Sequence, residues 1–420
     1  MKDIAIIGSG IAGLTTAHLL SREHNVTVFE KNDYIGGHTA TKDITLNGEN
    51  HAIDTGFIVC NDRTYPNFLT LMSQLNIELK ETEMSFSVLN QRTGLEYNGH
   101  GLNSLFAQRS NLFNPKFWLL IREILSFNKR CKALYHEDNI SEGATLGDFL
   151  TQHNYSDYFS QHYILPMGAA IWSTSLKEMK AFELRFFIRF FYNHGLLNVS
   201  DRPQWYVVEG GSRNYIPALT KPFQDNIELN SHIKEVIRTD DTVTIVFDDG
   251  SERIFDDVVF ACHSDQALKL LKTPTALEQE ILGDIPYSRN EVVLHHDINV
   301  LPKRKLAWAS WNYLLSDNDN SQTQPASVTY NMNILQGLKS DTTFCVTLNQ
   351  SEMINPDKVI EKYVYHHPVF NTKSMVAQRR RDEICGKNNT HFAGAYWYNG
   401  FHEDGVNSGL DVAKRFGLTL

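Results

Sequence analysis

The chain has 420 residues, of which 42% are hydrophobic and 21% charged, and its formal net charge is −10 at pH 7. This length predicts a large buried core and more than one domain, and the composition is that of an ordinary soluble protein. The acidic balance argues against a nucleic-acid partner, since phosphate binding needs clustered Lys and Arg. The one dense basic run, 379–381, is followed at once by two acids and predicts a solvated loop.

The first thirty residues predict a strand, a glycine-rich turn, a helix and a second strand. A short apolar run at 2–7 leads into Gly8-Ser9-Gly10-Ile11-Ala12-Gly13, residues 14–20 have a helical pattern, and the strand 25–29 ends on Glu30. In this order Gly8 makes the tight turn, Gly10 lets a pyrophosphate approach the backbone, and Gly13 lets the helix pack closely. The free N–H groups at the helix start favour phosphates, and Glu30 can accept hydrogen bonds from a ribose. We therefore predict dinucleotide binding, with a purely structural β–α turn as the alternative.

A second glycine pair indicates which dinucleotide binds. Lys31 follows Glu30, and Gly36-Gly37-His38-Thr39 comes shortly after. This pair resembles the Gly-Gly motif of the FAD-binding amine-oxidase and carotenoid-desaturase superfamily, which implies that its backbone contacts the flavin's phosphates and ribityl chain. The usual family form is Gly-Gly-Arg, and the neutral imidazole of His38 is a weaker phosphate partner than Arg. The resemblance implies FAD as cofactor. Only one G-x-G-x-x-G precedes a helix, so we do not expect NAD(P)H as the main partner.

Further segments resemble the same superfamily. Thr55-Gly56-Phe57-Ile58 resembles the segment that runs along the flavin, Ile233 lies in a strand like those whose backbone holds the adenine, and Ala261 ends a strand near the cofactor. After the strand that ends on Gly394, a helix is predicted from Val406 to Arg415. Glu403-Asp404-Gly405-Val406 resembles the last flavin motif, where N–H groups at a helix start stabilise the charge of the reduced flavin. Many relatives have an acid where Ala395 stands, and Glu403 and Asp404 are the nearby acids that can compensate.

The order of the elements predicts an α/β fold. We expect a Rossmann-like FAD-binding domain of the amine-oxidase type and a discontinuous α+β substrate domain with a mixed sheet and helices. The FAD-binding domain is expected at 1–77, 201–268 and 385–420, and the substrate domain at 78–200 and 269–384. Within the latter, residues 316–324 predict a polar loop.

One stretch of the expected substrate domain is strongly aromatic. Residues 182–192 hold five Phe and one Tyr, with Arg185 and Arg189 between them. Core packing is one interpretation. The other is the wall of a long apolar substrate channel, with a face that touches a membrane, and both can hold.

The cysteines indicate no special chemistry. Five of them are scattered without C-x-x-C or ligand spacing, so neither a disulfide framework nor a metal site is predicted. None has a recognisable flavin-attachment context, so FAD is expected without a covalent bond. The first strand leaves no room for a signal peptide, and no apolar run approaches the roughly twenty residues of a membrane span. We expect a cytoplasmic protein, while peripheral membrane contact and the oligomeric state stay open.

Three functions remain open. The runs 167–173, 261–267 and 400–405 resemble bacterial proteins catalogued as flavin-containing amine oxidases, some of them associated with cyclopropane-type and furan fatty-acid pathways. That resemblance implies hydride removal from a lipid-like, unsaturated or methyl-branched acyl chain, with His402 as the base for the adjacent proton. A structural role in the turn is the alternative for His402. An amine oxidase would have an aromatic cage and a Lys near the flavin, but residues 289–292 contain no Lys and one cage position falls on His402. A non-enzymatic flavin-holding protein is the third possibility.

Overall fold

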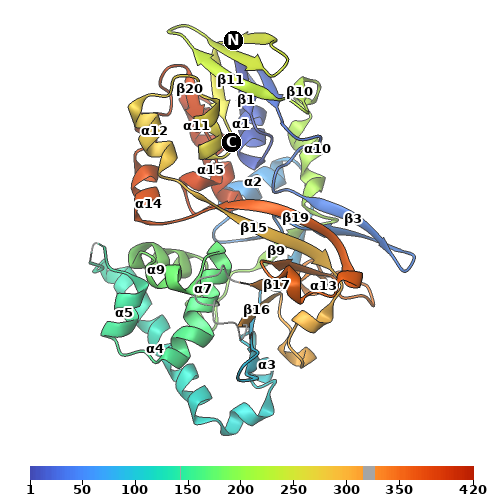
Figure 1. Cartoon of the computed structure of the whole chain (residues 1–420), viewed down its shortest axis with the longest axis vertical. Helices are drawn as coiled ribbons and strands as arrows, with labels where there is room; N and C mark the ends of the chain where they lie inside the picture. The colour runs from blue at the N-terminus through green and yellow to red at the C-terminus, as the bar shows by residue number, and fades with distance from the viewer. Residues whose placement is uncertain (142, 316–326) are drawn as a thin grey trace.

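The computed structural model describes residues 1–141, 143–315 and 327–420, so the predicted polar loop at 316–324 lies outside the described residues. Figure 1 shows an upper body that holds both chain ends and a lower body with a group of helices on one side. Two long strands, β15 (Tyr287–His295) and β19 (Val359–Pro368), cross between the bodies. Within the described part of the chain, no helix is long and apolar enough to cross a membrane.

The upper body is built on a five-stranded parallel sheet with the order β10-β2-β1-β14-β20. Its strands are β1 (Asp3–Ile7), β2 (Asn25–Phe29), β10 (Ile227–Glu228), β14 (Asp257–Phe260) and β20 (Thr390–Phe392). All five come from the three segments expected to form the FAD-binding domain. Strands β1 and β14 are apolar after their first residue, because the sheet is covered by helices and by Phe247 and Phe255, whose rings pack on Phe29 of β2. The predicted Rossmann-like α/β fold is confirmed.

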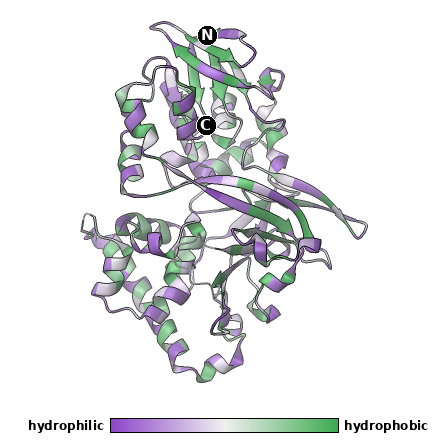
Figure 2. Ribbon diagram, viewed as in Figure 1, coloured by the Kyte–Doolittle hydropathy of each residue, from purple (hydrophilic) through white to green (hydrophobic). Residues whose placement is uncertain are grey.

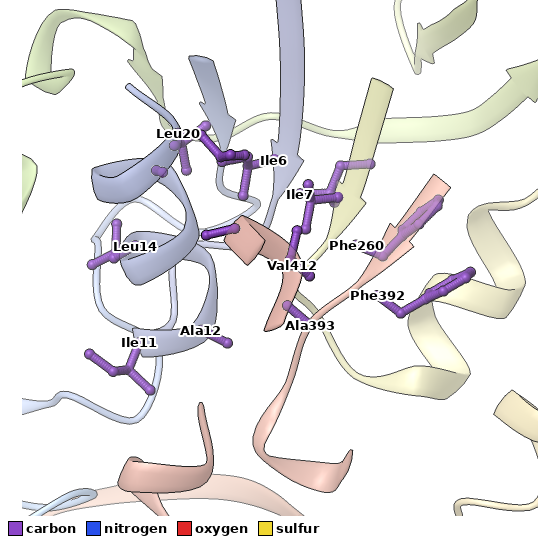
Figure 3. Close-up of a cluster of buried hydrophobic side chains, with 14 of the residues drawn as sticks. Ile6, Ile7, Ile11, Ala12, Leu14, Leu20, Phe260, Phe392, Ala393 and Val412 are labelled. Atoms are coloured by element: carbon purple, nitrogen blue, oxygen red, sulfur yellow. The ribbon is translucent and has the colours of Figure 1, made fainter. Parts of the chain in front are cut away.

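Two helices pack together against this sheet, α1 (Ile11–Leu20) and α15 (His402–Arg415). Close approach depends on a glycine: a Cβ added at Gly409 would lie 2.9 Å from the carbonyl oxygen of Ala12. Figure 3 shows the core beside them, where Ile7 of β1 faces Phe260 of β14 and Phe392 of β20. Helix α15 starts at His402, four residues before the predicted start.

Other elements complete the upper body. The helices are α2 (Pro66–Gln74), α10 (Ile216–Thr220), α11 (Ser264–Leu270), α12 (Ala276–Gly283) and α14 (Thr372–Arg379). The strands are β3 (Thr41–Leu46) with β4 (Glu49–Asp54), and β11 (Ile233–Arg238), β12 (Val243–Phe247) and β13 (Glu252–Phe255). Helices α12 and α14 lie in a range expected for the substrate domain, yet Ile281, Leu282 and Ala377 pack into the upper core. The remaining domain boundaries stay predictions.

The basic run before the last strand is not a solvated loop. Arg381 is 7% exposed, and its guanidinium donates to the carbonyl oxygens of Phe392 and Ser408. Arg380 pairs with Glu280. The run therefore ties α14 to the sheet and to α15.

The lower body contains a seven-stranded mixed sheet with the order β19-β15-β18-β17-β16-β7-β8, in which β7 and β16 pair in parallel and the other neighbours are antiparallel. Its other strands are β7 (Phe86–Asn90), β8 (Glu96–Asn98), β16 (Trp311–Leu315), β17 (Val328–Asn331) and β18 (Cys345–Leu348). A small sheet of β5 (Val59–Asn61), β9 (Trp205–Val208) and β6 (Leu79–Thr82) lies near the junction of the two bodies.

The helices beside this sheet include α3 (Leu102–Leu105), α4 (Pro115–Glu137), α5 (Leu146–Gln152), α7 (Leu165–Trp172), α8 (Leu176–Lys180) and α9 (Leu184–Asn193). Figure 2 shows hydrophilic and hydrophobic residues alternating along them, as in half-buried helices. The aromatic run of α9 is core: Phe187 and Phe191 stack 4.0 Å apart, and both are almost fully buried. Its rings therefore do not form a lipid-facing surface.

Candidate active site

The turn between β1 and α1 has the geometry of an anion site. Gly8 has φ +110°, and a Cβ there would lie 2.7 Å from the carbonyl oxygen of Ala261. A Cβ at Gly13 would lie 2.1 Å from the oxygen of Gly8, whereas one at Gly10 would meet nothing within 4 Å. Helix α1 has no side-chain cap and no acid in its first turn. Open space above Gly10 and uncapped N–H groups, starting at Ile11 and Ala12, fit a pyrophosphate.

Glu30 lies at the end of β2 beside this turn and is 7% exposed. One of its oxygens accepts from the backbone N–H and the hydroxyl of Ser9, at 3.0 and 2.6 Å. The other accepts from the backbone and side-chain amides of Asn32, at 2.9 and 2.8 Å. Lys31 is exposed. The N–H of Ser231 donates to the backbone oxygen of Glu30, and this bond places the nearby Ile233 beside the same turn. A ribose hydroxyl can replace the Ser9 hydroxyl or the Asn32 side chain and leave both backbone bonds in place.

The second glycine pair lies directly against the first motif. The N–H of Gly36 donates to the oxygen of Ser9 at 3.1 Å, and Gly36 and Gly37 both have positive φ. A Cβ at Gly37 would lie 3.2 Å from the Cα of Gly10. Thr39 is buried, and its hydroxyl lies 2.5 Å from that of Tyr215. The structure thus brings the two glycine motifs together.

The segment 55–58 runs beside 38–40. The N–H of Phe57 donates to the oxygen of His38 at 2.7 Å, and a Cβ at Gly56 would lie 2.2 Å from the same oxygen. Thr55 bonds through its hydroxyl to Tyr365 on β19 at 3.0 Å, and Ile58 is buried. This contact places the lower sheet directly over the expected flavin segment.

Five rings meet where the two bodies join, and we call them the junction cluster: His38, His263, Tyr287, Tyr365 and His367. The ring of His38 lies 4.9 Å from that of Tyr365 and 5.7 Å from that of His367, and His263 stacks on Tyr287 at 4.3 Å. Burial, reinforced by the neighbouring imidazoles, lowers the pKa of His38 to about 3 and that of His367 to about 4. Burial raises the pKa of Tyr365 to about 12.

The pKa of His263 is likewise lowered by burial, and that of Tyr287 is raised by burial. All five rings are therefore uncharged at neutral pH. In addition, Nε2 of His38 is buried without a hydrogen-bond partner among the described residues. An unpartnered buried nitrogen beside the glycine pair fits a bound group that supplies the missing partner.

A chain of amides indicates which tautomer of His367 is present. The N–H of Glu291 donates to Oδ1 of Asn349, whose Nδ2 donates to Oδ1 of Asn290 at 2.8 Å. Nδ2 of Asn290 therefore points away from Asn349, and it lies 3.2 Å from the oxygen of Ser288 and 3.3 Å from Nδ1 of His367. Because an amide nitrogen only donates, this contact favours the tautomer in which Nδ1 of His367 accepts and the ring proton is on Nε2. The hydroxyl of Ser173, 3.1 Å from Nδ1, can donate to the same nitrogen.

His402 is the first residue of α15, and its ring lies in the upper core. Its Nε2 is 2.7 Å from the hydroxyl of Tyr215, and the ring stacks on Phe57 at 3.7 Å with an interplanar angle of 7°. Burial, together with the nearby His38, lowers the pKa of His402 well below its usual value. To act as a base through Nε2, His402 would have to give up its bond to Tyr215, so the catalytic role stays a prediction.

The two acids of the first turn of α15 have partners within the protein. Glu403 accepts from the N–H groups of Asn67 and Phe68, at 3.0 and 2.7 Å, and so caps α2. Asp404 accepts from the N–H of Phe401 at 2.8 Å, and burial, with Glu403 as a further cause, raises its pKa to about 7.

The remaining predicted residues of this region pack on neighbouring backbone. A Cβ at Gly405 would lie 2.5 Å from Ile11, and Val406 is fully buried. The N–H of Gly394 donates to the hydroxyl of Ser408 at 2.7 Å. These contacts bring the first turn of α15 next to the first turn of α1, at the same end of the sheet as the glycine motifs.

A cavity of about 660 Å³ opens on the other side of this turn. It lies between the starts of α2 and α15 and the ends of α4 and α9. Residues that line it include Tyr65, Asn67, Lys132, His194, Glu403 and Asp404. Two buried carboxyl groups therefore face a polar space beside the expected flavin helix.

No sequence motif indicated the roles of Tyr215, Asn290, Tyr365 and His367. Tyr363, Tyr365 and His367 alternate along β19, and this period of two was the one signal that could have placed them on a common face. Their proximity to His38 depends on the pairing of β15 with β19, in which Ser288 is opposite His367.

The chain matches a known protein family. The family model described as "Flavin containing amine oxidoreductase" matches residues 11–294. The chain is 37% identical over 98 residues to the 1-hydroxycarotenoid 3,4-desaturase of Flavobacterium sp. (strain P99-3), a match that covers 23% of this chain and 18% of that protein. The chain thus spans less than a fifth of the length of that curated relative.

Solved structures share the fold over nearly the whole chain. Cyclohexylamine oxidase from Brevibacterium oxydans IH-35A is similar with a TM-score of 0.70 at 15% identity, covering 99% of this chain and 98% of that one. A fatty acid isomerase from P. acnes that produces CLA is similar with a TM-score of 0.65 at 15% identity, covering 98% of each chain. At these identities the likeness concerns the fold alone.

Proposed function

The chain belongs to the family of flavin-containing amine oxidoreductases, and on this premise we propose that it is an FAD-dependent oxidoreductase acting on an uncharged, hydrophobic substrate of the acyl-chain class. The observation that carries the proposal is the junction cluster, whose five rings are uncharged at neutral pH. A buried ammonium group is stabilised most strongly by a carboxylate. The faces of Tyr287 and Tyr365 can contact a cation, but none of the five members is a carboxylate.

The protein groups that would hold FAD surround the first glycine motif. The uncapped start of α1 and the open space above Gly10 suit the pyrophosphate, and Glu30 suits the ribose. The backbone of 36–39 and 55–58 and the first turn of α15 would line the rest of the cofactor. When bound, FAD supplies the acceptor for a hydride. An amine oxidase was expected to have a Lys near the flavin, on the strand that in this chain carries Asn290 instead.

The chain's own residues at the junction orient the substrate. His367 offers an N–H at Nε2, held in that tautomer by Asn290. A carbonyl oxygen can accept this bond, whereas an ammonium group cannot. Tyr215 and Thr39 hold His402 in place, and this fixes the start of α15. We therefore expect an acyl carbonyl near His367 and the apolar chain among the surrounding rings.

Anaerobic mixing of the FAD-bound protein with two sets of compounds tests this proposal. Methyl-branched and unsaturated fatty acyl methyl esters form one set, and hexylamine and putrescine form the other. We expect members of the first set to bleach the flavin absorbance and the amines not to. Bleaching by an amine, with no response to any ester, would overturn the acyl proposal.

Amine oxidation is the second candidate, and the polar cavity favours it. Glu403 and Asp404 are both buried and line this space, so it could receive a protonated amine. If amines reduce the flavin, Asp404→Asn should raise the amine concentration needed for half-maximal reduction about tenfold or more. The same substitution should not change the response to esters.

A further inference from the structure

The lower end of the molecule displays large apolar side chains to solvent. We call this surface the tip patch and define it by Leu102, Leu112, Phe113, Trp118 and Leu125. Phe113 is 88% exposed and Leu102 is 80% exposed. The patch comprises α3, a short 3₁₀ helix η1 (Arg109–Phe113) and the first half of α4. In Figure 1, α3 lies close to the lower end of the long axis, far from the chain ends.

The tip patch is held in shape by specific contacts. Nε1 of Trp118 donates to the carbonyl oxygen of Leu112 at 2.9 Å, which fixes η1 on α4. The ring of Phe106, which is buried, packs 5.3 Å from that of Trp118. Arg109 donates to the carbonyl oxygens of Asn103 and Phe106. The apolar side chains are therefore presented on an ordered surface, and such surfaces mark interaction sites.

The charge around the tip patch is opposite to that of the whole chain. Residues 100–133 contain six Lys and Arg and one acid, Glu123, whereas the chain carries a net charge of −10. Glu123 is buried and accepts from Ser156. Within the described part of the chain, Lys116, Arg122 and Lys129 form no ion pair.

The exposed face of α4 alternates apolar and basic residues. Trp118, Arg122, Leu125 and Lys129 are all exposed and follow one another at spacings of four, three and four residues. This spacing puts them in one stripe along the helix. A helix with Trp and Leu beside Lys and Arg on its outer face is suited to the boundary between lipid head groups and acyl chains.

We propose that the tip patch docks on the surface of an anionic phospholipid bilayer. The apolar side chains would enter the head-group region, and the unpaired basic residues would face lipid phosphates. A nucleic acid would use the basic residues but leave Phe113 and Leu102 exposed, so the bilayer explains more of the surface. The inference does not depend on the proposed substrate, although docking would bring an acyl-lipid enzyme to its substrates.

Flotation of the FAD-bound protein with vesicles tests the proposal. One set of vesicles is pure phosphatidylcholine, and the other contains equal parts of phosphatidylcholine and phosphatidylglycerol. We expect binding to the anionic vesicles at low salt and at least tenfold weaker binding to the neutral ones. Phe113→Ser with Trp118→Ser should weaken binding at least tenfold, and Lys116→Gln, Arg122→Gln and Lys129→Gln should each weaken it about fivefold.

Ile254→Ser is the matched control, since Ile254 is 67% exposed on β13 in the upper body. It should bind like the wild type. The proposal is overturned if the wild type does not bind anionic vesicles, or if the variant with Phe113→Ser and Trp118→Ser binds them as well as the wild type. It is also overturned if that variant converts a dimer into a monomer in sedimentation without changing vesicle binding, because the patch would then be a subunit interface.

Discussion

At the scale of single residues, Asn290 decides what His367 can do. An Asp at this position would accept a proton from Nδ1, whereas the amide donates to Nδ1 and leaves the proton on Nε2. His367 is thus a donor rather than a base. This distinction depends on two backbone groups, the N–H of Glu291 and the oxygen of Ser288, which fix the amide orientations.

We expect His367 to stay neutral, with its proton on Nε2, from pH 8 down to about pH 5, because burial lowers its pKa to about 4. An exposed histidine titrates near pH 6.5 by comparison. Ring ¹⁵N NMR of histidine-labelled protein measures both properties, and His367→Gln identifies the signal by its loss. A proton on Nδ1 would contradict the assigned tautomer of His367, and titration between pH 6 and 7 would contradict its lowered pKa.

Asp404 gives a pH-dependent effect on stability. Its pKa rises from 3.8 in the unfolded chain to about 7 in the fold, mainly through burial. The folded state therefore holds the proton more tightly, and the free energy of unfolding falls as the pH rises from 3.8 to about 7. Asp404→Asn keeps an oxygen for the N–H of Phe401, and it should stabilise the protein at pH 8 by on the order of a few kcal/mol.

Urea unfolding at pH 5 and pH 8 checks this effect. The gain from Asp404→Asn should be larger at pH 8, since much of the cost of ionising Asp404 is absent at pH 5. Asp33→Asn, in an exposed turn, serves as the control and should change little at either pH. An equal gain at both pH values would mean that Asp404 does not carry the buried charge.

At the scale of elements, local patterns were predicted well and one helix start was not. The succession β1, α1 and β2 is encoded in consecutive residues, and the structure reproduces it. Helix α15 starts earlier than expected because Phe401 is its N-cap, with Asp404 bonding the Phe401 N–H in place of the usual Ser, Thr, Asp or Asn cap. Gly405 precedes the predicted helix, although it is one of the residues of α15 that contact α1, since a Cβ there would lie 2.5 Å from Ile11.

The contact between α15 and α1 predicts an unusual effect of Gly409→Ala. In an open helix this change stabilises by roughly 0.5–1 kcal/mol. Here the added Cβ would lie 2.9 Å from the oxygen of Ala12. We expect destabilisation of about 1–3 kcal/mol instead, measured by urea unfolding.

Gly283→Ala at the end of α12 is the control for this substitution, because its Cβ would meet only Leu268 at 3.9 Å. It should be neutral or slightly stabilising. A Gly409→Ala protein as stable as the wild type would show that the two helices can separate without cost.

At the scale of the whole molecule, the junction cluster could not be predicted. Its members come from positions 38, 263, 287, 365 and 367, and only the spacing of two between Tyr365 and His367 relates any of them. Their meeting depends on strand register and on how the lower sheet lies over 55–58. The FAD segments were easier, because each combines glycines with a local turn whose geometry follows from the residue types.

The central claim is that FAD binds at the uncapped start of α1, and Gly10→Ala tests it most directly. Gly10 has φ −69°, which alanine adopts readily, and its added Cβ would meet nothing within 4 Å. The fold should therefore be unaffected, while the methyl group takes the space meant for the pyrophosphate. FAD affinity, measured by the fluorescence of added FAD, should fall at least tenfold, with unfolding of the FAD-free protein unchanged. Binding of FAD to Gly10→Ala as tight as to the wild type would contradict this account.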